Sequence, residues 1–241
     1  MNTDPVFKIK IRNSSDFKFD AGVVDVFDDM VVRSVPFYLE IQRMITEIAN
    51  DYAQPGSAVY DLGCSTGTTL LSLDTVIDPS IRFVGIDESS QMLESCQKNF
   101  LAQGMERPFQ LMEADLNKQV ELREASVVVL CLTLQFVRPI NRPALLKEIF
   151  KQLNSGGCII LVEKVLGESP DFNRHFIKYY YGFKRRNSYE DMEIAQKREA
   201  LENVLVPYTL SEDIQLLKNA GFHSCETFFK WHNFAGFVAL K

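Results

Sequence analysis

The residues best suited to chemistry lie in one stretch, from Val59 to Gly67, which reads Val-Tyr-Asp-Leu-Gly-Cys-Ser-Thr-Gly. Its apolar start predicts a short buried strand. Gly63 and Gly67 predict a tight turn, because a residue without Cβ tolerates positive φ and lets the backbone approach a ligand closely. The carboxylate of Asp61 can accept hydrogen bonds from loop amides or from the amino group of a ligand. We therefore expect a small-molecule binding loop between a strand and a helix.

A second carboxylate follows at a spacing typical of nucleotide-binding α/β units. The apolar strand 82–86 ends at Asp87, which lies 20 residues after Gly67, where such units place the acid that binds ribose hydroxyls. The loop lacks the G-x-G-x-x-G pattern, so a dinucleotide site and a purely structural turn are weaker alternatives. The pattern Asp-Leu-Gly-x-x-x-Gly, followed by a strand that ends in an acid, resembles the S-adenosylmethionine (SAM)-dependent methyltransferase superfamily. This resemblance implies that the loop binds SAM.

The glycine turn also matches a different class of enzyme. Residues Gly63 to Gly67 fit G-x-S-x-G, the nucleophile elbow of α/β-hydrolases. Three histidines could complete a catalytic triad: His175, His223 and His232. However, no His-Gly-Gly motif for an oxyanion hole precedes the elbow. A hydrolase is the weaker alternative.

Composition narrows the classes of partner. The net charge is −6 and the pI about 5.2, which argues against direct binding of nucleic acid. No run of 18 apolar residues predicts a membrane span, and residues 1–10 lack the apolar core of a signal peptide. Five scattered cysteines form no C-x-x-C and indicate neither a disulfide framework nor a zinc site. We expect a cytoplasmic protein without a bound metal and without a membrane anchor.

The order of predicted elements is that of a doubly wound α/β fold. The expected strands are 59–62, 83–86, 109–113, 126–132, 158–163, 224–229 and 233–240. The expected helices are 21–32, 37–52, 68–76, 90–102, 142–153, 189–204 and 211–220, with Ser34 as the N-cap of the second. These elements predict a seven-stranded, mostly parallel sheet of the class I SAM-dependent methyltransferase type (Rossmann-like), with an antiparallel strand at the carboxyl terminus.

We expect the whole chain, residues 1–241, to form a single domain. In it, the helices of residues 1–54 would cover the cofactor, and a helical insertion at 166–206 would lie over the active site. The insertion is rich in aromatic residues and carries the basic run 184–186. Such a segment is suited to substrate specificity or to contacts between subunits, so we expect a homodimer.

Further sequence blocks resemble one particular family. They are Phe27-Asp28-Asp29-Met30, Arg33-Ser34-Val35-Pro36, Thr133-Leu134-Gln135-Phe136, Glu163-Lys164, Phe183-Lys184-Arg185 and Gln196-Lys197-Arg198. Together with the glycine turn they are similar to the carboxy-S-adenosyl-L-methionine (carboxy-SAM) synthases, from about residue 16 to the end. The resemblance implies that the chain converts SAM and prephenate into carboxy-SAM and phenylpyruvate. In this family the product feeds modification of the wobble uridine of tRNA (cmo5U34).

The resemblance also implies roles for individual residues. Arg198 matches the arginine that binds the carboxylate of carboxy-SAM, a planar bidentate pairing that lysine cannot reproduce. The remaining matched cofactor contacts are Tyr38, Asp61, Gly63, Cys64, Ser65, Asp87, Glu88, Asp115 and Leu116. Cys131 departs from the asparagine that is common in the family, and a thiol is a poor hydrogen-bonding group. A methyltransferase of a small molecule or tRNA, and an idle SAM-binding subunit of a tRNA-modifying complex, are the alternatives.

Overall fold

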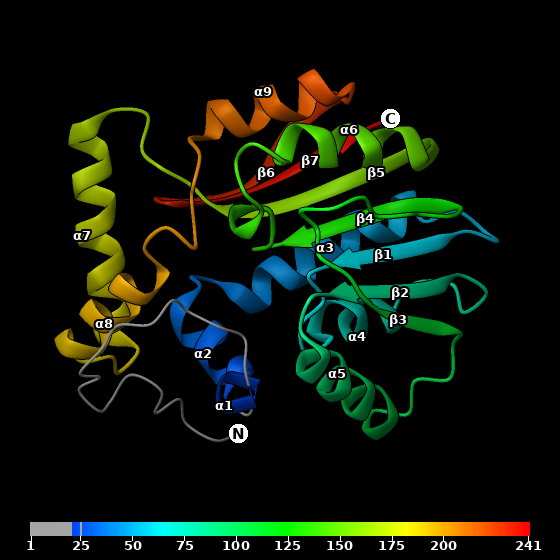
Figure 1. Cartoon of the computed structure of the whole chain (residues 1–241), viewed down its shortest axis with the longest axis horizontal. Coiled ribbons are helices and arrows are strands. Elements are labelled where there is room, and N and C mark those ends of the chain that lie inside the picture. Colours follow the sequence, from blue (N-terminus) through cyan, green and yellow to red (C-terminus); the bar gives the residue numbers. More distant parts are fainter. Residues whose placement is uncertain (1–20, 25) are drawn as a thin grey trace.

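A seven-stranded sheet forms the centre of the computed structural model, which describes residues 21–24 and 26–241 (Figure 1). The strands run in the order β3-β2-β1-β4-β5-β7-β6, and β7 is antiparallel to both of its neighbours. Their bounds are β1 Ala58–Leu62, β2 Arg82–Asp87, β3 Phe109–Glu113, β4 Ala125–Cys131, β5 Leu153–Lys164, β6 His223–Trp231 and β7 Phe234–Leu240. The predicted sheet is confirmed. Residues 1–20, with the expectation about a signal peptide, lie outside the described residues.

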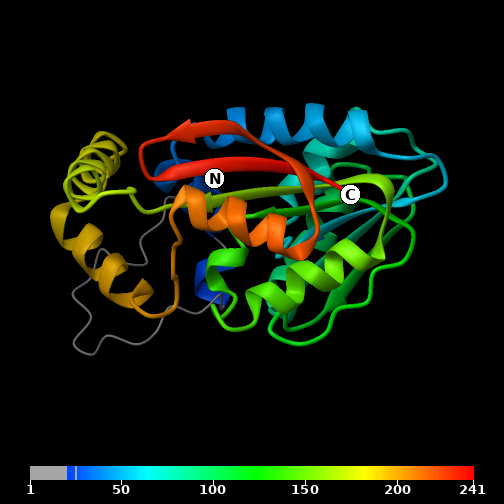
Figure 2. The ribbon, with the colours of Figure 1, turned by 90° about the horizontal axis from the view of Figure 1, so that it is seen from above.

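Helices cover both faces of the sheet, which explains the nearly continuous apolar sequence of its central strands. One face is covered by α3 (Tyr38–Tyr52), α4 (Thr68–Asp74) and α5 (Ser90–Ala102), and the other by α6 (Arg142–Gln152) and α9 (Leu210–Ala220) (Figure 2). Ile41 and Ile45 of α3 pack on the first face, and Leu146 of α6 and Leu217 of α9 on the second. Among the described residues, no helix is long and apolar enough to span a membrane.

The predicted insertion forms two helices, α7 (Pro170–Arg186) and α8 (Asp191–Leu201). They lie beyond the carboxyl ends of the parallel strands, at the left in Figure 1. Ser169 caps α7 by accepting a hydrogen bond from the Phe172 backbone N–H, and a capping box between Glu190 and Glu193 begins α8. The helix expected over 189–204 is therefore shorter at both ends.

Three local predictions are wrong. The expected helix 21–32 is divided into α1 (Ala21–Val24) and α2 (Phe27–Ser34). Residues 154–157, expected to form a turn, belong to β5. Ser34 does not cap α3. It ends α2, and α3 follows Phe37, whose backbone is left-handed at φ 57°.

Burial along α3 also differs from the helical pattern of its sequence. The apolar spacing of the expected helix 37–52 predicts that Leu39, Ile41 and Ile45 are all in the core. Ile41 and Ile45 are fully buried, but the side chain of Leu39 is 70 % exposed. Apolar spacing places a residue on one side of a helix but does not show whether another element covers it.

Arg142 fixes the connection that follows β4. Its side chain is 1 % exposed, and its guanidinium donates to the backbone oxygens of Val137 (2.9 Å), Gln135 (3.1 Å) and Val206 (2.6 Å). It therefore joins the 3₁₀ turn η1 (Leu134–Phe136) to the segment that returns from α8. Buried carbonyl oxygens need such a donor, because leaving them unsatisfied costs free energy.

We expect Arg142→Met to lower the free energy of unfolding by about 3–5 kcal/mol, the usual cost of removing one partner from a buried charged network. Urea unfolding followed by circular dichroism measures the change. The matched control is Arg138→Met, on the same connection but exposed, for which we expect a change below about 0.5 kcal/mol. Equal changes in the two variants would contradict this structural role of Arg142.

Candidate functional site

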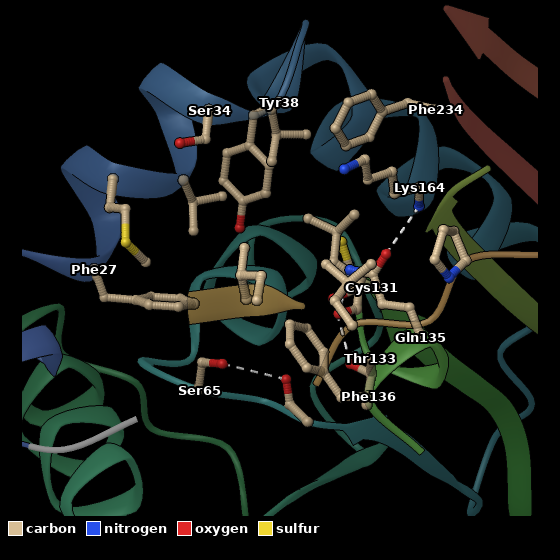
Figure 3. A pocket seen from close by; sticks show the side chains of 18 of the residues that line it. Phe27, Ser34, Tyr38, Ser65, Cys131, Thr133, Gln135, Phe136, Lys164 and Phe234 are labelled. Atoms are coloured by element: carbon tan, nitrogen blue, oxygen red, sulfur yellow. Dashed lines mark hydrogen bonds between the residues drawn. The ribbon is translucent and has the colours of Figure 1, made fainter. Parts of the chain in front are cut away.

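A cavity of about 650 Å³ lies at the carboxyl ends of the parallel strands (Figure 3). This is where ligands bind in doubly wound sheets, and the volume suits a small organic molecule. Its walls come from α2, the loops after β1 to β4, the end of β5, and the inner faces of α7 and α8. Phe27, Met30 and Val31 of α2 supply an apolar wall.

The glycine turn forms the part of the wall that follows β1. Gly63 has φ +80° and Gly67 φ +87°, and a Cβ at Gly67 would lie 2.6 Å from Cys96 Sγ. A Cβ at Gly63 would collide with the side chain of Thr133. Both glycines are therefore required by the backbone and by close neighbours. The turn brings the backbone of Ser65 to the cavity.

Asp87 organises the turn from the end of β2. One carboxylate oxygen accepts the backbone N–H of Ser65 (3.0 Å) and the other accepts that of Ser89 (2.9 Å). Burial raises the pKa of Asp87, and these hydrogen bonds oppose the rise. The carboxylate lines the cavity with acceptor capacity to spare.

Asp61 is buried without a donor. Its side chain is 1 % exposed, and within the described part of the chain neither carboxylate oxygen has a hydrogen-bond partner. The loop amides therefore do not bind it, which corrects one of the two roles expected for this residue. Burial, with a smaller effect of Asp87, raises the pKa of Asp61 to about 7. Such a group is suited to receive a positively charged ligand group.

Tyr38 and Cys131 lie on the cavity wall close to Asp61. Burial raises the pKa of both, and the charge of Asp61 raises each further, which places the three side chains near one another. The amide of Gln42 donates to Cys131 Sγ at 3.7 Å, and Gln42 Oε1 has no described partner. The thiol thus stays protonated and hydrogen-bonds weakly.

Cationic side chains gather on the opposite side of the cavity, beyond β4. Lys164 ends β5, Lys184 belongs to α7, and Lys197 and Arg198 belong to α8; all four line the cavity. Lys184 and Lys197 are buried, whereas Arg198 is exposed at the rim. Burial lowers the pKa of Lys164 and that of Lys184. The two sides of one cavity therefore carry opposite charge.

The structure brings most of the expected site residues together. Those that line the cavity are Tyr38, Gly63, Cys64, Ser65, Asp87, Glu88, Leu116, Cys131 and Arg198. Asp61 is buried behind the wall, and Asp115 lies beside Glu88, whose pKa it helps to raise, but does not line the cavity. The roles of these residues remain predictions.

Sequence reasoning gave no site role to Lys164, Lys197 or Tyr180, and it considered Lys184 only as part of the basic run 184–186, a candidate anion or RNA site. All three lysines stand in the family-like blocks quoted above, which was the available signal. The hydrolase alternative gains no support, because no histidine lines the cavity. His175 and His232 instead contact Tyr179 on the outer side of α7. No group of metal-binding side chains occurs among residues 21–24 and 26–241.

Proteins of known name that are similar in sequence assign the chain to one family. The chain is 51 % identical over 242 residues to the carboxy-S-adenosyl-L-methionine synthase of Methylococcus capsulatus, with 100 % of each chain covered. It is 42 % identical over 229 residues to the enzyme of that name from Desulfotalea psychrophila, covering 95 % of this chain and 93 % of the relative. A family model described as a methyltransferase domain matches residues 59–157.

Solved structures show the fold. An O-methyltransferase family protein from Burkholderia thailandensis is similar with a TM-score of 0.67 and 13 % identity, covering 92 % of this chain and 60 % of that one. Human N-acetylserotonin methyltransferase is similar with a TM-score of 0.61 and 17 % identity, covering 91 % of this chain and 55 % of that one. This chain thus spans little more than half of either. Its fold is that of the class I SAM-dependent methyltransferases.

The buried carboxyl of Asp61 predicts a pH effect on stability. Its pKa is about 7 in the folded chain and about 3.9 in an unfolded one. Ionisation therefore destabilises the fold progressively as pH rises from about 4 to about 7, and fully above that range. We expect Asp61→Asn to gain about 2–4 kcal/mol of stability relative to the parent chain between pH 4 and pH 8.

Urea unfolding at both pH values, without ligand, measures this gain. Asp51→Asn is the matched control, because Asp51 is exposed on α3. The same pH dependence in Asp61→Asn, Asp51→Asn and the parent chain would contradict the unpaired state of Asp61.

Proposed function

Because the chain belongs to the carboxy-S-adenosyl-L-methionine synthase family, we propose that it converts SAM and prephenate into carboxy-SAM, phenylpyruvate and water. The family assignment makes it a SAM-dependent transferase. We propose further that its product serves the modification of the wobble uridine of tRNA. A net charge of −6 supports an enzyme that acts on small molecules and does not itself bind RNA. We propose that it is cytoplasmic, because its five scattered cysteines suit a reducing compartment.

The opposite charges across one cavity carry this proposal. SAM contains an ammonium and a sulfonium group, and prephenate is a dicarboxylate. The acidic side, with Asp61 and Asp87, complements the first molecule. The cationic side, with Arg198, complements the second and the carboxylate of the product.

The acidic side fits SAM by its chemistry. Asp61 has two buried oxygens without a described donor, which the SAM ammonium would supply. Asp87 and Glu88, at the end of β2, are suited to the ribose hydroxyls and the adenine. Leu116 and the turn at Asp115 would bound the adenine, and Gly63, Cys64 and Ser65 would adjoin the methionine part. Phe27 and Tyr38 support the proposal that the amino-terminal helices cover this ligand.

Arg198 is proposed to bind the carboxylate that the reaction adds to SAM. Its planar guanidinium can make two parallel hydrogen bonds to that group. The residue lies on α8 at the cavity rim, and its exposure gives it the freedom to swing onto a bound ligand. Its role is to hold the new carboxylate. That group forms when the SAM methyl, after losing a proton to the hydroxide released by prephenate, binds the carbon dioxide that prephenate also releases.

Cys131, which stands where the family resemblance leads us to expect asparagine, bears on this reaction. It lies on the wall near Asp61 and Tyr38, and its thiol receives the Gln42 amide. We propose that Cys131 packs beside SAM and that synthase activity is retained with cysteine, because the residues proposed to bind SAM and the new carboxylate are present.

We expect Arg198→Ala to lower carboxy-SAM formation by about 10²-fold or more, because a charge-assisted bidentate contact contributes about 3 kcal/mol or more. The purified enzyme is incubated with SAM and prephenate, and mass spectrometry detects a product heavier than SAM by one carbon dioxide. Arg186→Ala, an exposed residue of α7, is the matched control.

Each result decides between the alternatives. Product in the parent chain, lost in Arg198→Ala and retained in Arg186→Ala, supports the synthase. If the chain binds SAM, forms no carboxy-SAM and methylates an added nucleophile, the synthase assignment is replaced by that of a methyltransferase. Binding of SAM without any turnover would favour the idle subunit. Absence of SAM binding would overturn the role given to the glycine turn.

We also propose that the enzyme is a homodimer with α7 in the interface. Phe172 is 62 % exposed on this helix, and Tyr179 and Ile177 are exposed as well, a cluster that favours a protein contact. We expect Phe172→Glu to shift sedimentation from dimer to monomer, with Lys178→Glu as the control. A parent chain that sediments as a monomer would contradict the proposal.

A further inference from the structure

A half-buried lysine, Lys164, and a buried one, Lys184, have no function in the synthase site as described so far. Lys164 ends β5 (Figure 3), and its ammonium lies 5.3 Å from the ring centre of Tyr180. The Lys184 ammonium, on α7, lies 4.9 Å from the same ring centre. Both side chains line the cavity. Two positive charges are thus held close to one aromatic ring, on the side of the cavity away from Asp61.

Neither charge is compensated by the described chain. No carboxylate oxygen of residues 21–24 or 26–241 lies within 4.0 Å of the ammonium of Lys164 or Lys184. Lys184 is 5 % exposed. Burial lowers its pKa well below the ordinary value, and the neighbouring charges of Lys197 and Lys164 lower it further. Burying an uncompensated ammonium costs several kcal/mol.

Contact with tyrosine rings does not offset that cost. A cation over an aromatic ring contributes about 0.5–2 kcal/mol, which is less than the penalty of burial. The lysines also cannot serve as an RNA-binding surface, because Lys184 faces the cavity while Arg185 and Arg186 carry the exposed charge of this run. An anion inside the cavity is the ligand that would compensate both groups.

We propose that Lys164 and Lys184 form a carboxylate subsite that positions the second substrate, separate from the Arg198 contact. The inference rests on the proposed function, because it assigns the subsite to prephenate. Sheet order places β5, which ends in Lys164, across β4 from the acidic residues of β1 and β2, so SAM bound at those acids would leave Lys164 open to a second ligand. Tyr180 and Phe234, which pack edge to face at 5.4 Å, offer an aromatic wall for the substrate ring.

The test is the affinity for prephenate of the enzyme saturated with S-adenosylhomocysteine, which has no methyl to carboxylate. Isothermal titration calorimetry gives the dissociation constant. We expect Lys184→Met and Lys164→Met each to raise it by about 10-fold or more, since a hydrogen bond between charged groups contributes about 1.5–3 kcal/mol. Affinity for SAM should change by less than about twofold. Lys184→Arg, which keeps the charge, should restore part of the affinity for prephenate.

Lys178→Met is the matched control, because Lys178 lies on the same helix and is exposed. Thermal unfolding checks that Lys184→Met folds, as expected for a variant that loses a buried charge. An unchanged affinity for prephenate, or an equal loss of affinity for SAM, would overturn the subsite. Prephenate binding to the parent chain that fails to yield carboxy-SAM would reject the proposed function alone. A parent chain that does not bind prephenate would reject both.

Discussion

The cavity depends on charges of both signs that are buried without described counter-ions. Asp61 belongs to β1 and Lys184 to α7, and neither side chain forms an ion pair with a described residue. They therefore do not neutralise each other. Each raises the free energy of the ligand-free fold, since removing a charge from water is costly unless it is paired. A ligand pair with complementary charges removes both penalties at once, so stability is sacrificed locally in favour of binding.

The two sides of the cavity are fixed by different means. The acids stand on strands within a packed sheet, and Lys164 likewise ends β5. The other cations stand on α7 and α8, and α7 packs on the sheet through Tyr180 against Phe234 and Phe183 against Trp231. Helix α2 reaches both sides: Asp28 accepts from Thr66 of the glycine turn (2.7 Å), and Ser34 accepts from Lys197 (3.0 Å). Movement of α2 would thus change the distance between the acidic and the cationic groups.

The sheet and the acidic side could be predicted because their signals are local. A buried strand, a glycine turn and a terminal acid follow one another in the sequence, and Asp87 lies where that order requires. On the cationic side only Arg198 could be predicted, through the family resemblance. The lysines could not, since a lysine ordinarily faces solvent. Burial of Lys184 results from the packing of α7 beside Tyr189 and α2. Ser34 was wrongly predicted as the N-cap of α3, because its hydrogen-bond partners, Tyr189 and Lys197, are distant in sequence.

Cys131 shows how a change of one wall residue alters the balance at Asp61. An asparagine there could offer an amide donor to the buried carboxylate, whereas a protonated thiol donates poorly. The Gln42 amide is directed at the sulfur rather than at Asp61. With cysteine, the carboxylate therefore depends more on the ammonium of its ligand. The substitution raises the cost of the empty cavity and makes binding of a cationic ligand the principal way to satisfy Asp61.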